Sequence, residues 1–149
     1  REMGPSDLDG VMAIEEVSFP TPWSRGMFLE DFPRDFSDTL VAAGTDDDVL
    51  GYAVCWTIAG ESHLLNIAVH PERRGQGIGR ALLSECIRRA ARAGASLIFL
   101  EVRAGNEGAQ RLYRSMGFAF RGIRKGYYTD TGEDAVILDR EVGKSDAAG

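Results

Sequence analysis

The stretch that decides the fold reads Asn66-Ile-Ala-Val-His-Pro-Glu-Arg-Arg-Gly-Gln-Gly-Ile-Gly-Arg80. It begins as a strand, breaks at Pro71, continues as a loop of Arg and Gly, and then starts a helix. Gly75, Gly77 and Gly79 alternate, so the backbone can approach a ligand with no Cβ in the way. Free N–H groups and the helix dipole favour an anion at the start of a helix, so the stretch predicts a pyrophosphate cradle.

Two common phosphate loops do not fit this stretch. A Walker loop requires Lys-Ser or Lys-Thr directly after its glycines, and neither pair follows here. A Rossmann fingerprint requires a third glycine three residues after the second, at the position where Arg80 stands. The pattern that remains is Arg74-x-x-Gly77-x-Gly79, to which Arg73 and Arg80 add positive charge. A glycine-rich turn with solvated arginines and no ligand remains the alternative interpretation.

Length and composition are those of one globular domain. The chain has 149 residues, 44% of them hydrophobic and 27% charged. A net charge of −6 and a pI of about 4.9 disfavour nucleic acid as a partner and are compatible with a basic peptide. No apolar run is long enough to cross a membrane and no signal-peptide pattern is present, so we expect a cytoplasmic protein. The chain begins at Arg1 rather than Met, so we expect a few residues to precede it, and the sequence leaves open whether they supply a first strand.

Cysteines and histidines give no sign of a disulfide framework or a metal centre. Cys55 and Cys86 form no C-x-x-C pair, and each lies in an apolar pattern, which predicts two small core residues. Cys55 is disfavoured as a nucleophile because no histidine accompanies it in a recognisable pattern. His63 and His70 lack metal-ligand spacing, so we expect no metal and place both histidines at strand ends.

Hydrophobic periodicity, caps and turn residues predict a single α/β domain over residues 1–142. The expected elements are helices at 8–17 and 24–32, strands at 39–43, 49–59 and 64–69, a helix at 77–93, a strand at 97–102, a helix at 106–116, and strands at 118–123 and 135–138. The first three strands are joined by short turns, the second of them at Glu61-Ser62, and should be antiparallel.

Helix 77–93 and the strands on either side of it predict a parallel crossover. The side chains expected on the buried face of this helix are Ile78, Ala81, Leu82, Cys86 and Ala90. The tail 143–149 is small and polar, and we expect it to be flexible.

The order of these elements and the Arg74-x-x-Gly77-x-Gly79 pattern resemble the GCN5-related N-acetyltransferase (GNAT) family across nearly the whole chain. Further stretches resemble the RimI type, the ribosomal-protein-alanine N-acetyltransferases. These stretches are Phe19-Pro-x-Pro-Trp-Ser24, Asn66-Ile-Ala-Val69, Leu100-Glu-Val-Arg-Ala-x-Asn106, Leu112-Tyr-x-Ser-x-Gly-Phe118, and Gly126-Tyr-Tyr128 with Gly132-Glu-Asp-Ala135. The resemblance implies the GNAT fold, a mixed central sheet of six to seven strands flanked by about four helices. The first stretch carries an extra residue before Pro22-Trp23. This segment faces the substrate in the family, so the resemblance implies the acceptor preference less directly than it implies the chemistry.

The resemblance also implies how acetyl-CoA binds. Its pantetheine arm would pair with the backbone of Ile67, Ala68 and Val69, and Asn106 would contact the same arm. The backbone N–H groups that would hold its pyrophosphate belong to Arg74, Gly75, Gln76, Gly77, Ile78, Gly79 and Arg80. Asn106 is also suited to be a helix N-cap, and the two roles are compatible.

Two side chains are implied to carry the chemistry. Glu101 would act as general base through a water molecule, and Tyr113 as general acid toward the departing thiolate. From position alone, Glu101 could instead form a structural ion pair with Arg103 or Arg121. Tyr113 could instead be a core tyrosine whose hydroxyl has a partner.

The acceptor is implied to lie against Pro22, Trp23, Tyr127 and Tyr128, although the two tyrosines could be no more than an aromatic pair on a strand. The expected acceptor is the N-terminal alanine of a small-subunit ribosomal protein, and the expected enzyme is a monomer or weak dimer. An α-amine, with an ordinary pKa of about 7.7–8.0, costs roughly 1 kcal/mol to deprotonate at pH 7, whereas a lysine side chain costs about 5 kcal/mol. Two alternatives stay open: a small amine such as a polyamine or aminoglycoside, and a CoA-binding sensor with no enzymatic activity.

Overall fold

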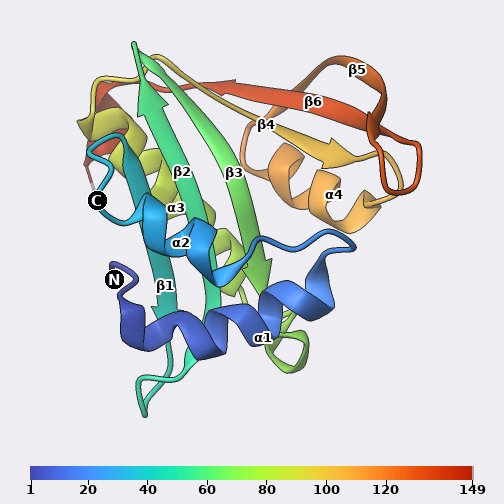
Figure 1. The fold of residues 1–149 in the computed structure, drawn as a ribbon. Helices are drawn as coiled ribbons and strands as arrows, with labels where there is room; N and C mark the ends of the chain where they lie inside the picture. The colour runs from blue at the N-terminus through green and yellow to red at the C-terminus, as the bar shows by residue number, and fades with distance from the viewer. Residues whose placement is uncertain (149) are drawn as a thin grey trace.

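A six-stranded mixed sheet in the order β1-β2-β3-β4-β6-β5 organises the chain (Figure 1). The structure, a computed structural model, describes residues 1–148. The strands are β1 Ser37–Ala43, β2 Val49–Ile58, β3 Glu61–Val69, β4 Leu97–Arg103, β5 Ala119–Tyr128 and β6 Glu133–Glu141. The helices are α1 Leu8–Ser18, α2 Arg25–Asp31, α3 Ile78–Arg92 and α4 Glu107–Ser115, with 3₁₀ turns η1 Pro5–Asp7, η2 Pro71–Arg73 and η3 Lys144–Ala147. The predicted mixed sheet with four flanking helices is confirmed.

Helices α1 and α2 lie in front of β1–β3 in Figure 1 and cover one face of the sheet. α1 buries Leu8, Val11 and Ile14, which recur at helical spacing. Ser24 is the N-cap of α2, where its side chain accepts a hydrogen bond from the Met27 N–H at 3.2 Å. Both helices occupy the positions predicted from the sequence.

Helices α3 and α4 pack on the opposite face and form the larger core with the sheet. The buried residues of α3 are Leu82, Leu83, Cys86, Ile87 and Ala90. The predicted stripe was wrong at Ala81, which is exposed, because Leu83 and Ile87 shift the buried face away from it. Cys55 and Cys86 are both buried free thiols in this core, as predicted.

The turn between β2 and β3 lies at Ala59 and Gly60, two residues before its predicted position. The φ angles are 52° and 83°, and a two-residue type I′ hairpin turn requires positive values at both positions. The prediction failed because alanine rarely adopts this conformation, so little in the sequence marks the turn. β5 is also longer than predicted, because its largely exposed side chains do not alternate between polar and apolar.

The parallel pair β3–β4 is short, and the two strands diverge after it, as Figure 1 shows. Residues 61–63 pair with residues 97–99, after which β3 continues beside β2 and β4 beside β6. Within the described chain, the edge of residues 64–69 that faces β4 therefore has no strand partner. This opening in the sheet positions the candidate site.

A β-bulge in β3 lies at the same place. Asn66 is opposite Val54 and Leu64 is opposite Cys55, which leaves Leu65 as the extra residue. Bulges commonly redirect a side chain next to a functional site. Here the bulge turns Asn66 toward α1, where its side chain finds a hydrogen-bond partner.

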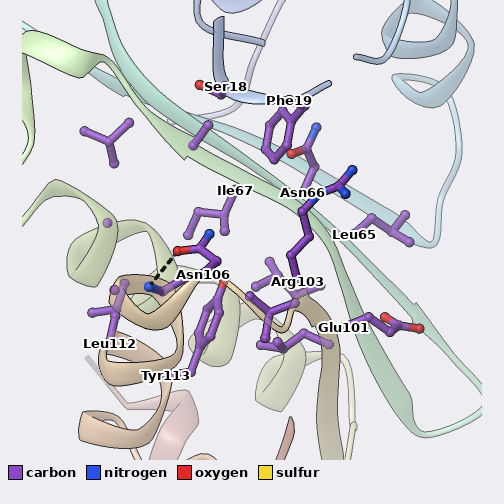
Figure 2. Close-up of a pocket in the computed structure, with 18 of the residues that line it drawn as sticks. Ser18, Phe19, Leu65, Asn66, Ile67, Glu101, Arg103, Asn106, Leu112 and Tyr113 are labelled. Atoms are coloured by element: carbon purple, nitrogen blue, oxygen red, sulfur yellow. Dashed lines mark hydrogen bonds between the residues drawn. The ribbon is translucent and has the colours of Figure 1, made fainter. Parts of the chain in front are cut away.

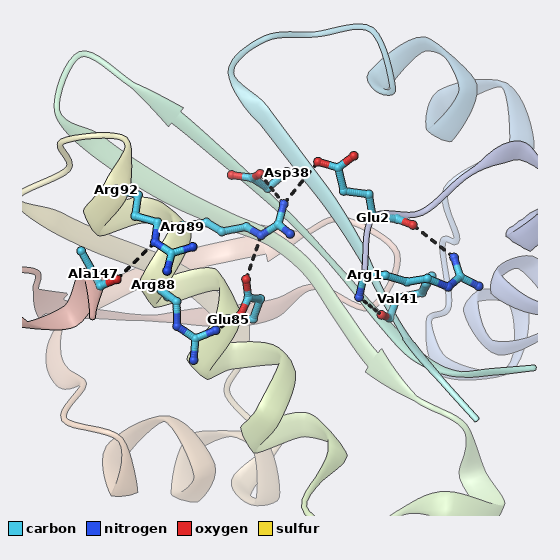
Figure 3. Close-up of polar contacts among 9 residues, drawn as sticks. All are labelled: Arg1, Glu2, Asp38, Val41, Glu85, Arg88, Arg89, Arg92 and Ala147. Atoms are coloured by element: carbon cyan, nitrogen blue, oxygen red, sulfur yellow. Dashed lines mark hydrogen bonds and ion pairs between the residues drawn. The ribbon is translucent and has the colours of Figure 1, made fainter. Parts of the chain in front are cut away.

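Ion pairs around Arg89 join α3 to β1 and to the start of the chain (Figure 3). The Arg89 guanidinium lies 3.0 Å from Glu85, 3.2 Å from Asp38 and 3.5 Å from Glu2. Glu2 forms a bridge with Leu40 of β1, so the first residues extend the edge of the sheet.

The tail 143–149 was predicted to be flexible, and its last residue, Gly149, lies outside the described residues. Within it, η3 contacts α3: the Ala147 carbonyl accepts a hydrogen bond from Arg92 Nε at 3.1 Å (Figure 3). Asp146 pairs with Arg140 of β6 at 3.0 Å. Among the helices of residues 1–148, none has the length and apolar character needed to span a membrane.

Candidate active site

A cavity of about 1320 Å³ fills the opening between β3 and β4. Its middle is lined by residues 64–69 of β3 and 100–103 of β4. One end reaches the loop before α3. The other end lies between residues 18–23, where α1 ends and the next loop begins, and residues 127–130, where β5 ends and the β5–β6 loop begins. Figure 2 shows the middle of this cavity, with Tyr113 and Asn66 on opposite sides of it.

The loop end of the cavity presents free backbone N–H groups. α3 begins at Ile78, so the N–H groups of Ile78, Gly79 and Arg80 have no acceptor within the helix. Gly77 is the N-cap, with φ of 81°, and supplies no side chain to cap them. A bound anion would therefore meet unpaired N–H groups and the positive end of the helix dipole.

Arginine side chains add positive charge at this end. Arg73 and Arg74 are exposed and line the cavity, and Arg111 joins them from α4. Arg80 differs from them, because its Nη2 donates to Ser115 Oγ at 2.8 Å and thereby ties α3 to α4.

Tyr113 reaches the cavity from the core side of the sheet. Its side chain is 6% exposed and packs on Phe118, with 5.8 Å between ring centroids. Burial raises the pKa of the Tyr113 hydroxyl above its usual range, with Cys86 and Tyr128 contributing. Within residues 1–148 this hydroxyl makes no hydrogen bond, yet it is not among the fully buried unpartnered atoms, so it is open to the cavity (Figure 2).

Asn106 caps α4, as its sequence context predicted. Its Oδ1 accepts a hydrogen bond from the Ala109 N–H at 3.2 Å, the dashed line in Figure 2. Its amide nitrogen stays available at the wall of the cavity, so capping leaves a donor for a ligand.

Glu101 reaches the cavity from the opposite face of the sheet, because Leu100 and Val102 on either side of it point into the core with Tyr113. Its side chain is 11% exposed, and in Figure 2 it points away from Tyr113. Its partner is neither Arg103 nor Arg121, the two arginines that its sequence position suggested. Instead, its Oε2 lies 2.6 Å from Nε2 of His63.

A buried carboxylate, Glu15 of α1, holds the loop that follows α1. Glu15 is 1% exposed and accepts hydrogen bonds from the Tyr52 hydroxyl at 2.5 Å and from Asn66 Nδ2 at 2.7 Å. Its other oxygen accepts from the backbone N–H of Trp23 at 2.9 Å. Three donors account for a carboxylate that would otherwise be costly to bury, and together they fix the loop to the bulge of β3.

Arg103 joins the two loops at the far end of the cavity. Its guanidinium lies 2.8 Å from Asp130 and 4.0 Å from the centre of the Tyr128 ring. Asp130 also accepts a hydrogen bond from Thr21 Oγ1 at 3.1 Å, which links the β5–β6 loop to the segment after α1. The Arg103 contact holds the pKa of Asp130 below its usual range. Burial raises the pKa of Tyr128 to about 12.

The cavity brings together nearly all the residues that the sequence singled out. Those that line it are Trp23, Ile67, Ala68, Val69, Arg74, Gly75, Gly77, Ile78, Gly79, Arg80, Glu101, Asn106, Tyr113, Tyr127 and Tyr128. Pro22 and Gln76 are exposed and do not line it. Tyr127 and Tyr128 do form an aromatic pair, at 5.1 Å and 90°, and both also face the cavity.

Sequence reasoning missed Glu15, His63 and the Arg103–Asp130 pair. Glu15 lies seven residues after Leu8, on the buried face of α1, and a carboxylate at such a position signals a buried partner. His63 was placed at a strand end, but it lies inside β3. No group of three or more His, Cys, Asp or Glu side chains in residues 1–148 is arranged to hold a metal ion.

Comparison with known proteins identifies the family. The model of the acetyltransferase (GNAT) family matches residues 8–118. A [ribosomal protein bS18]-alanine N-acetyltransferase of Haemophilus ducreyi is 34% identical over 135 residues, which cover 89% of this chain and 92% of that protein. The crystal structure of the ribosomal-protein-S18-alanine N-acetyltransferase from Escherichia coli has a TM-score of 0.86 and 32% identity, covering 96% of this chain and 92% of that one. A nourseothricin acetyltransferase structure has a TM-score of 0.68 and 35% identity, covering 74% and 68%.

The chain therefore belongs to the GNAT family and is an N-acetyltransferase. Within the family, the chain resembles the ribosomal-protein-alanine N-acetyltransferases over almost its full described length.

Proposed function

We propose that this protein transfers the acetyl group of acetyl-CoA to the N-terminal α-amine of the alanine that begins ribosomal protein bS18. The observation that carries the proposal is one continuous cavity with the glycine loop and the free N–H groups of α3 at one end and two joined segments at the other. Glu101 and Tyr113 enter it from opposite faces of the sheet. The choice of acceptor rests on the relatives, which are named as N-acetyltransferases of the alanine of this ribosomal protein.

The loop end has the donors that acetyl-CoA requires. The N–H groups at the start of α3 suit its pyrophosphate, and Arg73, Arg74 and Arg111 suit its remaining phosphate charge. The unpaired edge of residues 64–69 suits the amides of the pantetheine arm, which can pair with it as a strand would. Glycines at 75 and 77 leave open space where a Cβ would stand. The residues present thus fit the proposed cosubstrate.

Glu101 is proposed to take the proton that the amine must lose before it can attack the thioester. Its carboxylate lies on the face of β4 opposite Tyr113, and a water molecule can bridge this carboxylate and the amine. An α-amine costs roughly 1 kcal/mol to deprotonate at pH 7, so a carboxylate acting through water is sufficient. A lysine side chain costs about 5 kcal/mol and would need further help.

Tyr113 is proposed to stabilise the thiolate that leaves as the acetyl group moves to the amine. Because burial raises its pKa, full proton transfer to a thiolate, whose conjugate acid has a pKa of about 8.5, is unfavourable. Donation of a hydrogen bond from the hydroxyl does not require that transfer, and it is strongest where charge develops. The raised pKa therefore favours a hydrogen-bond donor over a complete proton donor.

The acceptor end supports a chain terminus as substrate. Trp23 faces the cavity from the loop after α1 and Tyr128 from the end of β5. The Thr21–Asp130 hydrogen bond joins the loop after α1 to the β5–β6 loop. A free N-terminus can enter the cavity end-on below the joined loops. A lysine in the middle of a chain would have to enter with polypeptide extending from it in two directions.

An acceptor on the ribosome implies that the enzyme works in the cytoplasm. We propose that it acts as a monomer or weak dimer.

The experiment that tests the proposal mixes the protein and acetyl-CoA with three acceptors in separate tubes. These are a peptide with the first residues of bS18 and a free N-terminal alanine, the same peptide with that amine blocked, and spermidine. Mass spectrometry is expected to detect one acetyl group on the free peptide alone. Acetylation of the blocked peptide would make lysine the target, and acetylation of spermidine alone would make the enzyme a small-amine acetyltransferase.

The small-amine alternative has one specific observation behind it, the similarity to the nourseothricin acetyltransferase over 74% of this chain. That similarity covers less of either chain than the one to the ribosomal-protein enzymes does. The sensor alternative has no observation behind it, because the family and the relatives of this chain are N-acetyltransferases.

A further inference from the structure

The imidazole of His63 is held on two sides. Its Nε2 lies 2.6 Å from Oε2 of Glu101, and its ring stacks on Phe99 with centroids 4.4 Å apart and planes 14° apart. The side chain is 28% exposed, so one edge of the ring still faces solvent. Stacking on Phe99 fixes the plane of the imidazole ring. The short hydrogen bond then fixes the position of the Glu101 carboxylate relative to that ring.

The topology of the sheet explains why these two side chains meet. His63 and Phe99 are partners in the last residue pair of β3 and β4 before the strands diverge. Glu101 is two residues beyond Phe99, so its side chain lies on the same face of β4. The contact therefore stands at the apex of the opening that forms the cavity.

Other partners of Glu101 are taken. Arg103 pairs with Asp130, and Arg121 pairs with Asp139 at 2.5 Å. Within residues 1–148, His63 is the one side chain bonded to Glu101, and Oε1 of Glu101 has no hydrogen-bond partner. A base must be a carboxylate, which has no hydrogen to give, so the hydrogen of this contact lies on Nε2 of His63.

We propose that His63 is a positioning residue for acetyl transfer: its Nε2–H holds Oε2 of Glu101, so that Oε1 stays directed at the water or amine from which it takes a proton. The role rests on the proposed function of Glu101 as base. It follows the general arrangement in which a base is oriented by a third group. It differs from a structural ion pair because it acts on the rate of transfer and only through Glu101.

Two substitutions separate the donor from the ring. His63→Phe keeps a ring to stack on Phe99 and removes the donor, whereas His63→Gln places an amide N–H near the position of Nε2 and removes the ring. We expect His63→Phe to lower kcat about tenfold, a size ordinary for contacting residues that act as a unit, with KM for acetyl-CoA unchanged. His63→Gln should remain within about threefold of the unsubstituted protein. A Gln variant no more active than the Phe variant would overturn the proposal.

A double-mutant cycle tests whether the effect passes through Glu101. In a Glu101→Gln background, His63→Phe should change the residual kcat by less than about twofold. An equal tenfold loss in both backgrounds would assign His63 a structural role. Thermal melting and acetyl-CoA titration of each variant detect loss of folding. The rates are measured on whichever amine the unsubstituted protein acetylates, so the cycle does not depend on the natural acceptor.

A measurement without turnover keeps the proposal testable if a variant fails to fold. In ¹⁵N-edited imidazole spectra of the unsubstituted protein, we expect a protonated Nε2 on His63, with a resonance that moves in Glu101→Gln. The chain has two histidines, so His70→Gln assigns the signals by removal. A bare Nε2, or a signal unaffected by Glu101→Gln, would contradict the contact. Failure of the unsubstituted protein to acetylate any amine would instead defeat the proposed function, and the role of His63 with it.

Discussion

Burial changes what a single side chain can do, and Tyr113 is the example in this molecule. Its ring lies in the core with Phe118, while its hydroxyl is open to the cavity and has no partner in residues 1–148. A core tyrosine normally has a partner for its hydroxyl, so the missing bond points to a ligand. The raised pKa keeps this group protonated at any working pH and therefore always ready to donate.

Removing that hydroxyl is predicted to affect turnover rather than binding. Tyr113→Phe should lower kcat by about 10²-fold, because it removes a donor to the developing thiolate while leaving the ring in place. The dissociation constant for acetyl-CoA, measured by calorimetry, should stay within about twofold. Equal losses in kcat and in affinity would mean that the side chain serves packing alone.

The elements of the chain divide into those that a sequence marks locally and those that depend on distant partners. The glycine loop and the capped helix after Asn106 were predicted because caps and glycines act within a few residues. The Ala59–Gly60 turn was missed because an alanine with positive φ leaves no such mark. β5 was predicted too short because an edge strand exposed on both sides carries little alternation.

The candidate site divides in the same way. Tyr113 and Glu101 could be proposed from the sequence because motifs place each of them within an expected element. Their partners were not, since the bond between Glu101 and His63 joins residues 38 positions apart, and the bond between Glu15 and Asn66 joins residues 51 apart. Only the pairing of strands and the bulge in β3 bring these groups together.

The loop before α3 offers a prediction with an internal control. Gly77→Ala should cost about 1–2 kcal/mol of stability, because a residue with a Cβ is strained at φ of 81°. Gly94→Ala, at φ of 84° after the end of α3, should cost about as much. Only Gly77→Ala should also weaken acetyl-CoA binding, by about tenfold, since the free N–H groups begin there. Equal binding by the two variants would argue against the cradle.

At the scale of the whole molecule, two loops far apart in sequence close one end of the cavity. Thr21→Val removes the hydrogen bond to Asp130 while keeping the shape of the side chain. We predict that KM for a peptide acceptor rises about two- to fivefold, the worth of one exposed hydrogen bond, with acetyl-CoA affinity unchanged. Steady-state kinetics with each substrate varied in turn measures both. An unchanged peptide KM would mean that the link does not shape the acceptor groove.

The pH dependence of stability also belongs to the whole molecule. Burial raises the pKa of Tyr52 and Tyr113 above the ordinary value of about 10. Both side chains therefore stay protonated in the folded state but ionise on unfolding above pH 10. Their stabilising effect is complete below pH 10 and is lost as pH rises, at about 1.4 kcal/mol per pH unit for each tyrosine.

Urea unfolding at pH 9, 10 and 11 measures this loss, which should be smaller in Tyr52→Phe because phenylalanine cannot ionise. The variant starts from lower stability, since Glu15 loses a donor, so the slope with pH is the quantity to compare. Identical slopes in the two proteins would contradict the assignment.

If the proposed function is right, the cavity selects the end of a polypeptide chain over an internal lysine. The most direct test is a competition within one molecule: a peptide with one free N-terminal alanine and one internal lysine, acetylated at neutral pH and mapped by tandem mass spectrometry. We predict acetyl on the alanine α-amine in large excess over the lysine, at every extent of reaction. Acetyl on the lysine at a comparable or greater rate would contradict it.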